Sequence, residues 1–130
     1  MTITSELKGH FLRLYQMALT DGDFSKTEWK MLYDMATERN ISHEELDRIL
    51  LSADGPIPIP NSIKTRIEYL IDFARLIWAD GKVTEDEKDT LVKYAKKFEF
   101  EESKLKKLTD YILEKIKQGV SKEELMSELN

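Results

Sequence analysis

The feature that most constrains this chain is a helix stop and restart that occurs twice in one register. An apolar stretch ends at Ala79, Asp80-Gly81 follows it, and charged residues at 84–87 begin a new helix pattern. A shift of 59 residues carries Asp21 onto Asp80. Between residues 5–52 and 64–111, the other identities under this shift are Gly22 with Gly81, Glu28 with Glu87, Leu32 with Leu91, Ala36 with Ala95, and Leu46 with Leu105. Such internal similarity predicts two related units.

The segments after both stops carry the signature of a helix N-terminus. Ser25-x-x-Glu28 and Thr84-x-x-Glu87 are capping boxes, in which hydroxyl and carboxylate satisfy backbone amides reciprocally. Ser42-x-x-Glu45 and Ser121-x-x-Glu124 repeat the pattern. Phe24 and Val83 precede their caps as matched hydrophobic staples. These residues therefore place four helix starts.

Apolar spacing of three and four residues predicts an all-α fold of about seven helices. We expect one domain over 1–130, with repeat one at about 5–52, a Pro-rich connector at 53–60, repeat two at about 61–118, and a C-terminal helix at 121–129. Each repeat holds three helices, and we expect them to pack with pseudo-two-fold symmetry. The helix that includes 63–79 is apolar over most of its circumference, which predicts that other helices surround it.

Composition excludes several classes of function. Net charge is −5, which argues against a nucleic-acid-binding surface. Cysteine is absent, so thiolate metal sites, disulfides and Cys nucleophiles are excluded. Residues 63–79 are the only candidate membrane span, and five charged side chains interrupt them, which favours a buried helix. The N-terminus lacks the pattern of a signal peptide.

The repeated Asp-Gly turn is similar to the second half of an EF-hand loop, but the first half argues against calcium binding. The first two ligand positions hold Met17 and Leu19 in one copy and Leu76 and Trp78 in the other, and these side chains cannot ligate calcium. Another carboxylate site stays open, formed by Asp21, Glu28, Asp80 and Glu87 with Asp23 as an extra ligand. Helix capping accounts for the same residues and is the favoured interpretation.

Other chemistry has little support in the sequence. His10 and His43 are isolated, and we interpret them as surface or cap-adjacent side chains. No catalytic triad or phosphate-binding loop is evident. Trp29 and Met31 could extend a partner patch, although Trp29 shares a face with Leu32 and is expected to close the edge of the core. Off the main stripe of their helix, Tyr111 and Leu113 are candidates for a dimer contact.

The segment 79–87, Ala-Asp-Gly-Lys-Val-Thr-Glu-Asp-Glu, resembles the signature of the TerB-like family of tellurite-resistance-associated proteins. A similar domain occurs in the co-chaperone DjlA. Residues 20–28 resemble the same signature, with Thr20 where Ala79 stands. The resemblance implies an all-helical pseudo-symmetric bundle, a cytoplasmic protein of a metal, tellurite or envelope stress response, and a divalent cation or a protein partner held by Asp21, Glu28, Asp80 and Glu87.

Three functions follow as expectations. The first is a non-enzymatic TerB-like interaction module with a protein partner, binding a divalent cation between its halves. The second is a small metal-dependent or acid-base enzyme. The third is a purely structural helical homodimer whose acidic turns only cap helices.

Overall fold

The computed structural model describes residues 4–20, 26–51, 59–81 and 83–129, without the side chains of 17–20, 26 and 80. Within these ranges the secondary structure consists of seven α-helices and two short 3-10 helices. The predicted all-α fold of about seven helices is therefore confirmed. Among the described residues no helix has the length and apolar character that a membrane crossing requires.

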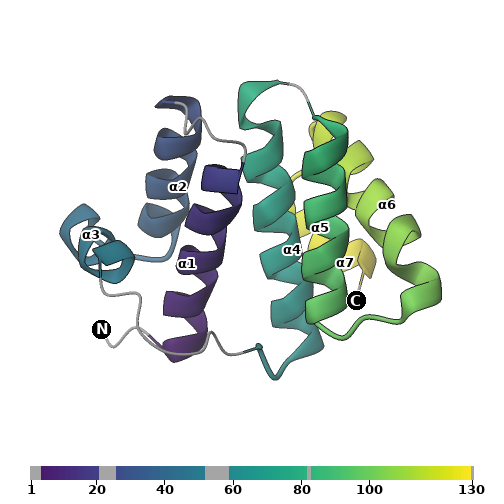
Figure 1. Ribbon diagram of the computed structural model, residues 1–130, viewed down its shortest axis with the longest axis horizontal. Coiled ribbons are helices and arrows are strands. Elements are labelled where there is room, and N and C mark those ends of the chain that lie inside the picture. The colour runs from purple at the N-terminus through teal and green to yellow at the C-terminus, as the bar shows by residue number, and fades with distance from the viewer. Residues whose placement is uncertain (1–3, 21–25, 52–58, 82, 130) are drawn as a thin grey trace. The chain divides into compact units, whose positions relative to one another are not determined.

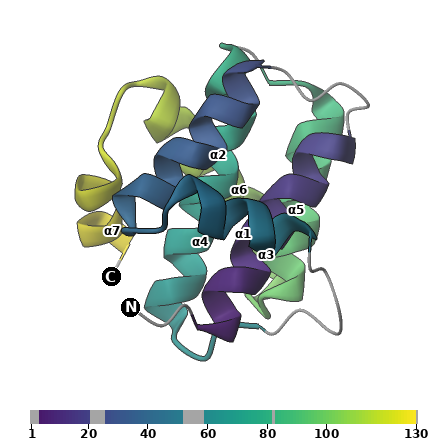
Figure 2. The same cartoon turned by 90° about the vertical axis from the view of Figure 1, so that its left-hand side faces the viewer.

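The chain divides into two compact units, Met1–Pro58 and Ile59–Asn130, called here the first and second unit. The division falls inside the predicted connector. The first unit holds α1 (Ser5–Thr20), α2 (Lys26–Glu38) and α3 (His43–Leu51). Each of these three helices contacts the other two, and α3 runs across α1 (Figures 1 and 2).

The second unit is built around α4 (Ile63–Ile77), which contacts α5 (Glu85–Lys97), α6 (Leu105–Lys117) and α7 (Lys122–Leu129). Nine of its residues are buried, from Ile67 to Ile77. The prediction that other helices surround this segment is correct. Its C-terminal end tightens into the 3-10 helix η1 (Trp78–Asp80), and a second 3-10 helix, η2 (Glu102–Lys104), leads into α6 (Figure 1).

Helix starts follow the predicted caps wherever the structure describes them. Glu45 N donates to Ser42 Oγ and Ser42 N donates to Glu45 Oε1, each at 3.1 Å. Thr84 and Glu87 form the same reciprocal box at the start of α5. Ser121 Oγ accepts from Glu124 N at 3.2 Å. The box predicted at 25–28 lies partly outside the described residues, because Ser25 is not among them. Asp21, Gly22, Asp23 and Phe24 also lie outside the described residues.

Two helices end in the same way at positions that the 59-residue shift relates. Ile41 N donates to Ala36 O at 2.9 Å, and Asn40 has a φ of 60°. Phe100 N donates to Ala95 O at 3.3 Å, and Glu99 has a φ of 65°. Both are Schellman ends, in which a left-handed residue turns the chain out of the helix. The C-terminal ends of α2 and α5 therefore have the same backbone geometry, at positions that the sequence repeat relates.

The same shift relates positions that are buried in both units. Fully buried pairs are Phe11 with Leu70, Leu14 with Phe73, Leu32 with Leu91, and Ala36 with Ala95. Leu46 and Leu105 are also both buried. Positions that the shift relates are therefore buried in both units, which is the burial pattern that a duplicated three-helix unit requires.

Glu99 supplies a direct test of the second Schellman end. A glutamate in the left-handed region is strained, whereas glycine adopts this conformation without steric cost. We expect Glu99→Gly to raise the free energy of unfolding by about 1 kcal/mol, measured by urea denaturation. Gly119 has a φ of 85°, and an added Cβ there meets no atom within 4 Å. Gly119→Ala should therefore lower stability by about 1 kcal/mol through backbone strain alone. Equal stability of wild type and Glu99→Gly would contradict this account.

Candidate functional site

Of the predicted metal ligands, Glu87 is the one that the structure shows in a helix cap. Its Oε1 atom accepts from Thr84 N at 2.8 Å, while Glu87 N donates to Thr84 Oγ1 at 3.1 Å. The carboxylate is therefore oriented toward the backbone of its own helix start. This is the capping role that the sequence favoured for the residue.

The other predicted ligands are described less completely. Glu28, in the first turn of α2, is buried with 6% of its surface exposed. Asp21 and Asp23 lie outside the described residues, and Asp80 is described only in its backbone, at the end of η1. No group of three or more acidic or histidine side chains suited to a metal ion occurs among the described residues. A cation site formed by Asp21, Glu28, Asp80 and Glu87 stays a prediction, which calcium, magnesium and zinc titrations of wild type, Asp21→Asn and Asp80→Asn would test.

A cleft of about 300 Å³ lies in the second unit, beside the repeated Asp-Gly turn. Its apolar lining comes from η1, the following turn and α6: Trp78, Val83 and Leu113. Its charged lining comes from α5 and α6: Lys88, Asp110, Glu114 and Lys117. The three α6 charges are exposed, whereas Leu113 is buried and Trp78 half-buried. The cleft therefore has a charged rim, with a buried leucine and a half-buried tryptophan among its other lining residues, and we call it the α6 cleft.

Two hydrogen bonds and one ion pair position the lining of the α6 cleft. The Trp78 indole N–H donates to Leu113 O at 2.9 Å, which fixes the ring against α6. On the rim, Gln118 Nε2 donates to Glu114 Oε1 at 3.3 Å, and Lys88 Nζ lies 3.7 Å from Glu85 Oε1. The indole is thereby pre-oriented, so a bound group would not have to order it.

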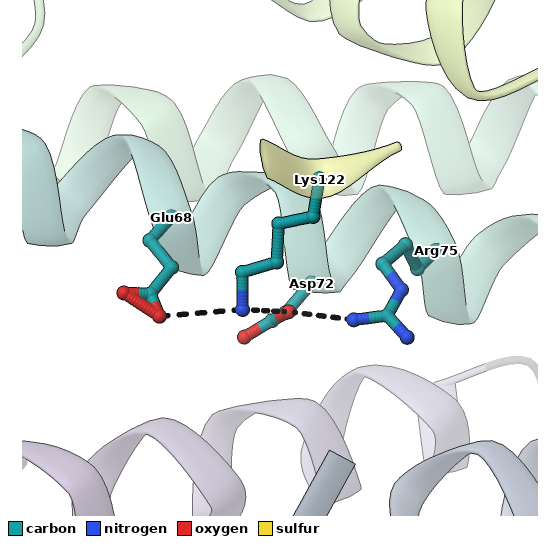
Figure 3. A network of polar contacts seen from close by, with 4 residues as sticks. All are labelled: Glu68, Asp72, Arg75 and Lys122. Carbon is teal, nitrogen blue, oxygen red and sulfur yellow. Dashed lines mark hydrogen bonds and ion pairs between the residues drawn. The ribbon is translucent and has the colours of Figure 1, made fainter. Parts of the chain in front are cut away.

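A second polar arrangement joins α4 to α7 (Figure 3). Lys122 Nζ lies 3.2 Å from both Glu68 Oε2 and Asp72 Oδ1, and Arg75 Nη1 lies 3.4 Å from Asp72 Oδ1. Asp72 is fully buried, while Lys122 exposes 18% of its side chain. A buried carboxylate requires such compensation by cations. We call these four residues the α4–α7 charge cluster, and its position indicates that it fixes α7.

In the first unit, aromatic side chains from three helices form a row. Ring centroids are 5.9 Å apart between Tyr15 and Trp29, 6.0 Å between Trp29 and Tyr33, and 4.7 Å between Tyr33 and His43. Trp29 is half-buried and lies in the middle of this row. It thus lies at the edge of the core, where the sequence placed it.

Tyr33 gives a pH prediction, because its hydroxyl donates to Asp47 Oδ1. This hydrogen bond, followed by burial and the Asp47 charge, raises the pKa of Tyr33 from 10.0 to about 12. The folded state holds the phenol proton more tightly than the unfolded state, so stability falls as pH rises from about 10 to about 12. We expect Asp47→Asn to reduce this fall, measured by chemical denaturation across that range. Asp34→Asn in the same unit is the control, and an unchanged pH slope in Asp47→Asn would contradict the assignment.

Several sequence interpretations need correction. His10 is fully buried rather than at the surface, with its ring 5.6 Å from Phe11. It lies three residues after Leu7 and four before Leu14, hence on the apolar face of α1. Leu113 is buried and lines the α6 cleft, so it is not an exposed dimer contact. Ile63, which begins the apolar segment, is 63% exposed because it occupies the first position of α4.

The sequence missed both the α6 cleft and the α4–α7 charge cluster as sites. Glu68, Asp72 and Arg75 were read as charges that interrupt an apolar helix, although their spacing places them on one side of α4. That spacing was the available signal for a polar stripe. Lys122 is 50 residues from Asp72, so no local pattern identifies it as the partner.

Comparison of the chain with models of known families, with curated proteins and with solved structures finds no match. The TerB-like resemblance therefore depends on the two turn segments, and the family assignment stays a prediction.

Proposed function

We propose that this chain is a non-enzymatic, TerB-like interaction module of a cytoplasmic stress response, and that its second unit binds a partner protein at the α6 cleft. The observation that carries the proposal is the composition of that cleft. Protein interfaces commonly combine an apolar centre with a polar rim. Here Trp78, Val83 and Leu113 are the apolar residues of the lining, and side chains of both charge signs make up the rest.

The cleft adjoins the segment in which the sequence signature lies. Trp78, Val83 and Lys88 come from the stretch that surrounds the Asp80-Gly81 turn. The turn and the Thr84–Glu87 box set the direction in which α5 leaves η1, and hence the distance between Val83 and α6. Capping and binding are therefore compatible roles for this segment, since the caps position the cleft walls and do not themselves contact the partner.

The partner's expected chemistry follows from the rim. Tryptophan is enriched among the residues that dominate binding energy, and Trp78 is held in place by Leu113 O. An apolar side chain of the partner would cover the indole. Lys88 and Lys117 would face its acidic groups, and Asp110 and Glu114 its basic groups. Charge pairs of this kind chiefly contribute specificity and association rate.

Affinity capture with charge-matched variants tests the proposal. Tagged wild type, Asp110→Lys/Glu114→Lys and Glu44→Lys/Glu123→Lys would be compared by quantitative mass spectrometry. Both variants change charge equally, but Glu44 and Glu123 are exposed outside the cleft. We expect at least one protein recovered with wild type and the control to be lost at least tenfold with the cleft variant. Identical recovery from all three chains would refute binding at this cleft.

A further inference from the structure

Three residues at three-residue steps attach α7 to the rest of the second unit. Lys122 pairs with Glu68 and Asp72, and Leu125 is fully buried. Glu128 Oε2 accepts from the Tyr111 hydroxyl at 2.5 Å. This spacing places Lys122, Leu125 and Glu128 on one side of the helix. The order along that side is cation, aliphatic residue, carboxylate.

The surface that receives α7 offers a different kind of partner at each end of the helix. The Lys122 end meets two carboxylates on α4, Glu68 and Asp72, as Figure 3 shows. The Glu128 end meets the Tyr111 hydroxyl on α6, and Lys115 Nζ lies 5.4 Å from the Tyr111 ring centroid. We call Glu68, Asp72, Tyr111 and Lys115 the α7 dock. Two carboxylates at one end and a hydroxyl donor at the other distinguish the two ends of a bound helix, and therefore favour one direction for it.

α7 is the element of the second unit that is best suited to leave its place. It has eight residues, and Leu125 is its one buried side chain among those described. A helix of this length is not stable in water by itself. Local opening costs least where few apolar side chains are buried. Gly119, at a φ of 85°, joins α7 to α6 through a short connection.

We propose that the α7 dock is a helix-binding surface, and that a partner protein's amphipathic helix replaces α7 there. The replacing helix carries a cation, an aliphatic residue and a carboxylate at positions i, i+3 and i+6. In the free protein α7 occupies the dock. A partner helix must therefore bind the dock more tightly than the tethered α7 does. This surface is separate from the α6 cleft, so the inference does not depend on the function proposed above.

The probe is a synthetic peptide that covers residues 119–130 of this chain, titrated into isotopically labelled full-length protein and followed by NMR. A tethered α7 competes at an effective concentration on the order of millimolar, so the full-length Leu125→Asp variant is used to unseat it. We expect this variant to bind the peptide at least tenfold more tightly than wild type does, with amide shifts at Glu68, Asp72 and Tyr111. A peptide carrying Lys122→Ala should bind at least tenfold more weakly.

Hydrogen exchange of the wild-type chain supplies a measurement that needs no variant. We expect α7 amides to exchange at least tenfold faster than the most protected amides of α4. Exchange of both helices at one common rate would overturn the proposal, as would a peptide that fails to bind the unseated chain. A wild-type dimer formed by exchange of α7 would also overturn it, because the dock would then serve a second copy of the chain.

Discussion

Replacing Phe73 with alanine should destabilise the second unit by about 3–5 kcal/mol. Phe73 lies in α4 with no exposed surface, and its ring stacks on Tyr94 at 4.4 Å between centroids and at an interplanar angle of 12°. Phe98 approaches from the end of α5 at 6.2 Å. Truncation would remove both aromatic contacts and leave a cavity in the rigid centre of the unit.

Urea denaturation can measure this loss in the second unit specifically. The chain has two tryptophans, Trp29 in the first unit and Trp78 in the second, so a Trp29→Phe background leaves Trp78 as the fluorescent reporter. Ile63→Ala is the control, because Ile63 belongs to the same helix but is 63% exposed. We expect it to cost less than about 0.5 kcal/mol. Similar losses for the two variants would show that α4 is not the centre of this core.

The second large effect is expected for Lys122→Met, at about 2–3 kcal/mol. The substitution keeps much of the side-chain volume but removes a cation that lies 3.2 Å from a fully buried carboxylate. Asp72 would retain Arg75, whose Nη1 lies 3.4 Å away. The loss is therefore smaller than for a buried ion with no remaining cation. It would again be measured by urea denaturation with Trp78 as the reporter.

Two further variants test whether the loss of stability in Lys122→Met comes from the burial of the Asp72 carboxylate or from the loss of an ion pair as such. Lys104 lies 3.4 Å from Glu101, and both side chains are mostly exposed, so Lys104→Met should change stability by less than about 0.5 kcal/mol. Asp72→Asn in the Lys122→Met background removes the buried negative charge and should restore part of the loss. If Lys122→Met is as mild as Lys104→Met, the α4–α7 charge cluster does not stabilise the docking of α7.

The sequence predicted those parts of the fold that local chemistry determines. The Ser42 and Thr84 boxes and the apolar surroundings of α4 follow from neighbouring residues. Repetition strengthened these predictions, because Ala36 and Ala95 occupy equivalent places before equivalent helix ends. The sequence did not separate η1 from α4 or η2 from α6, since 3-10 turns at helix ends depend on packing more than on composition.

Residues that act across elements were harder to predict. Trp78 is half-buried and lines the α6 cleft, and its indole N–H donates to a carbonyl 35 residues away, which no local pattern indicates. His10 was interpreted as a surface or cap-adjacent side chain because it is isolated in the sequence, although its position on α1 matches the apolar stripe. In His10, side-chain type and helical position pointed in different directions, and the packed structure decided between them.

The acidic turn residues illustrate how one motif supports two interpretations. Glu87 satisfies the backbone of its own helix start, and the same start directs Val83 and Lys88 into the α6 cleft. The capping residues therefore help to position the side chains that line the cleft. The α6 cleft carries the proposed function, because it brings together side chains from η1, α5 and α6 that no sequence pattern connects.

Site-specific photo-crosslinking in the protein's native cells tests the α6 cleft most directly. A photoreactive residue would replace Lys117 on the cleft rim or Lys107, which is also exposed on α6 but does not line the cleft. We predict that illumination yields a covalent adduct with a distinct protein from position 117 and none from position 107. Adducts of equal yield from both positions, or none from position 117, would contradict the assignment of this cleft as the partner-binding site.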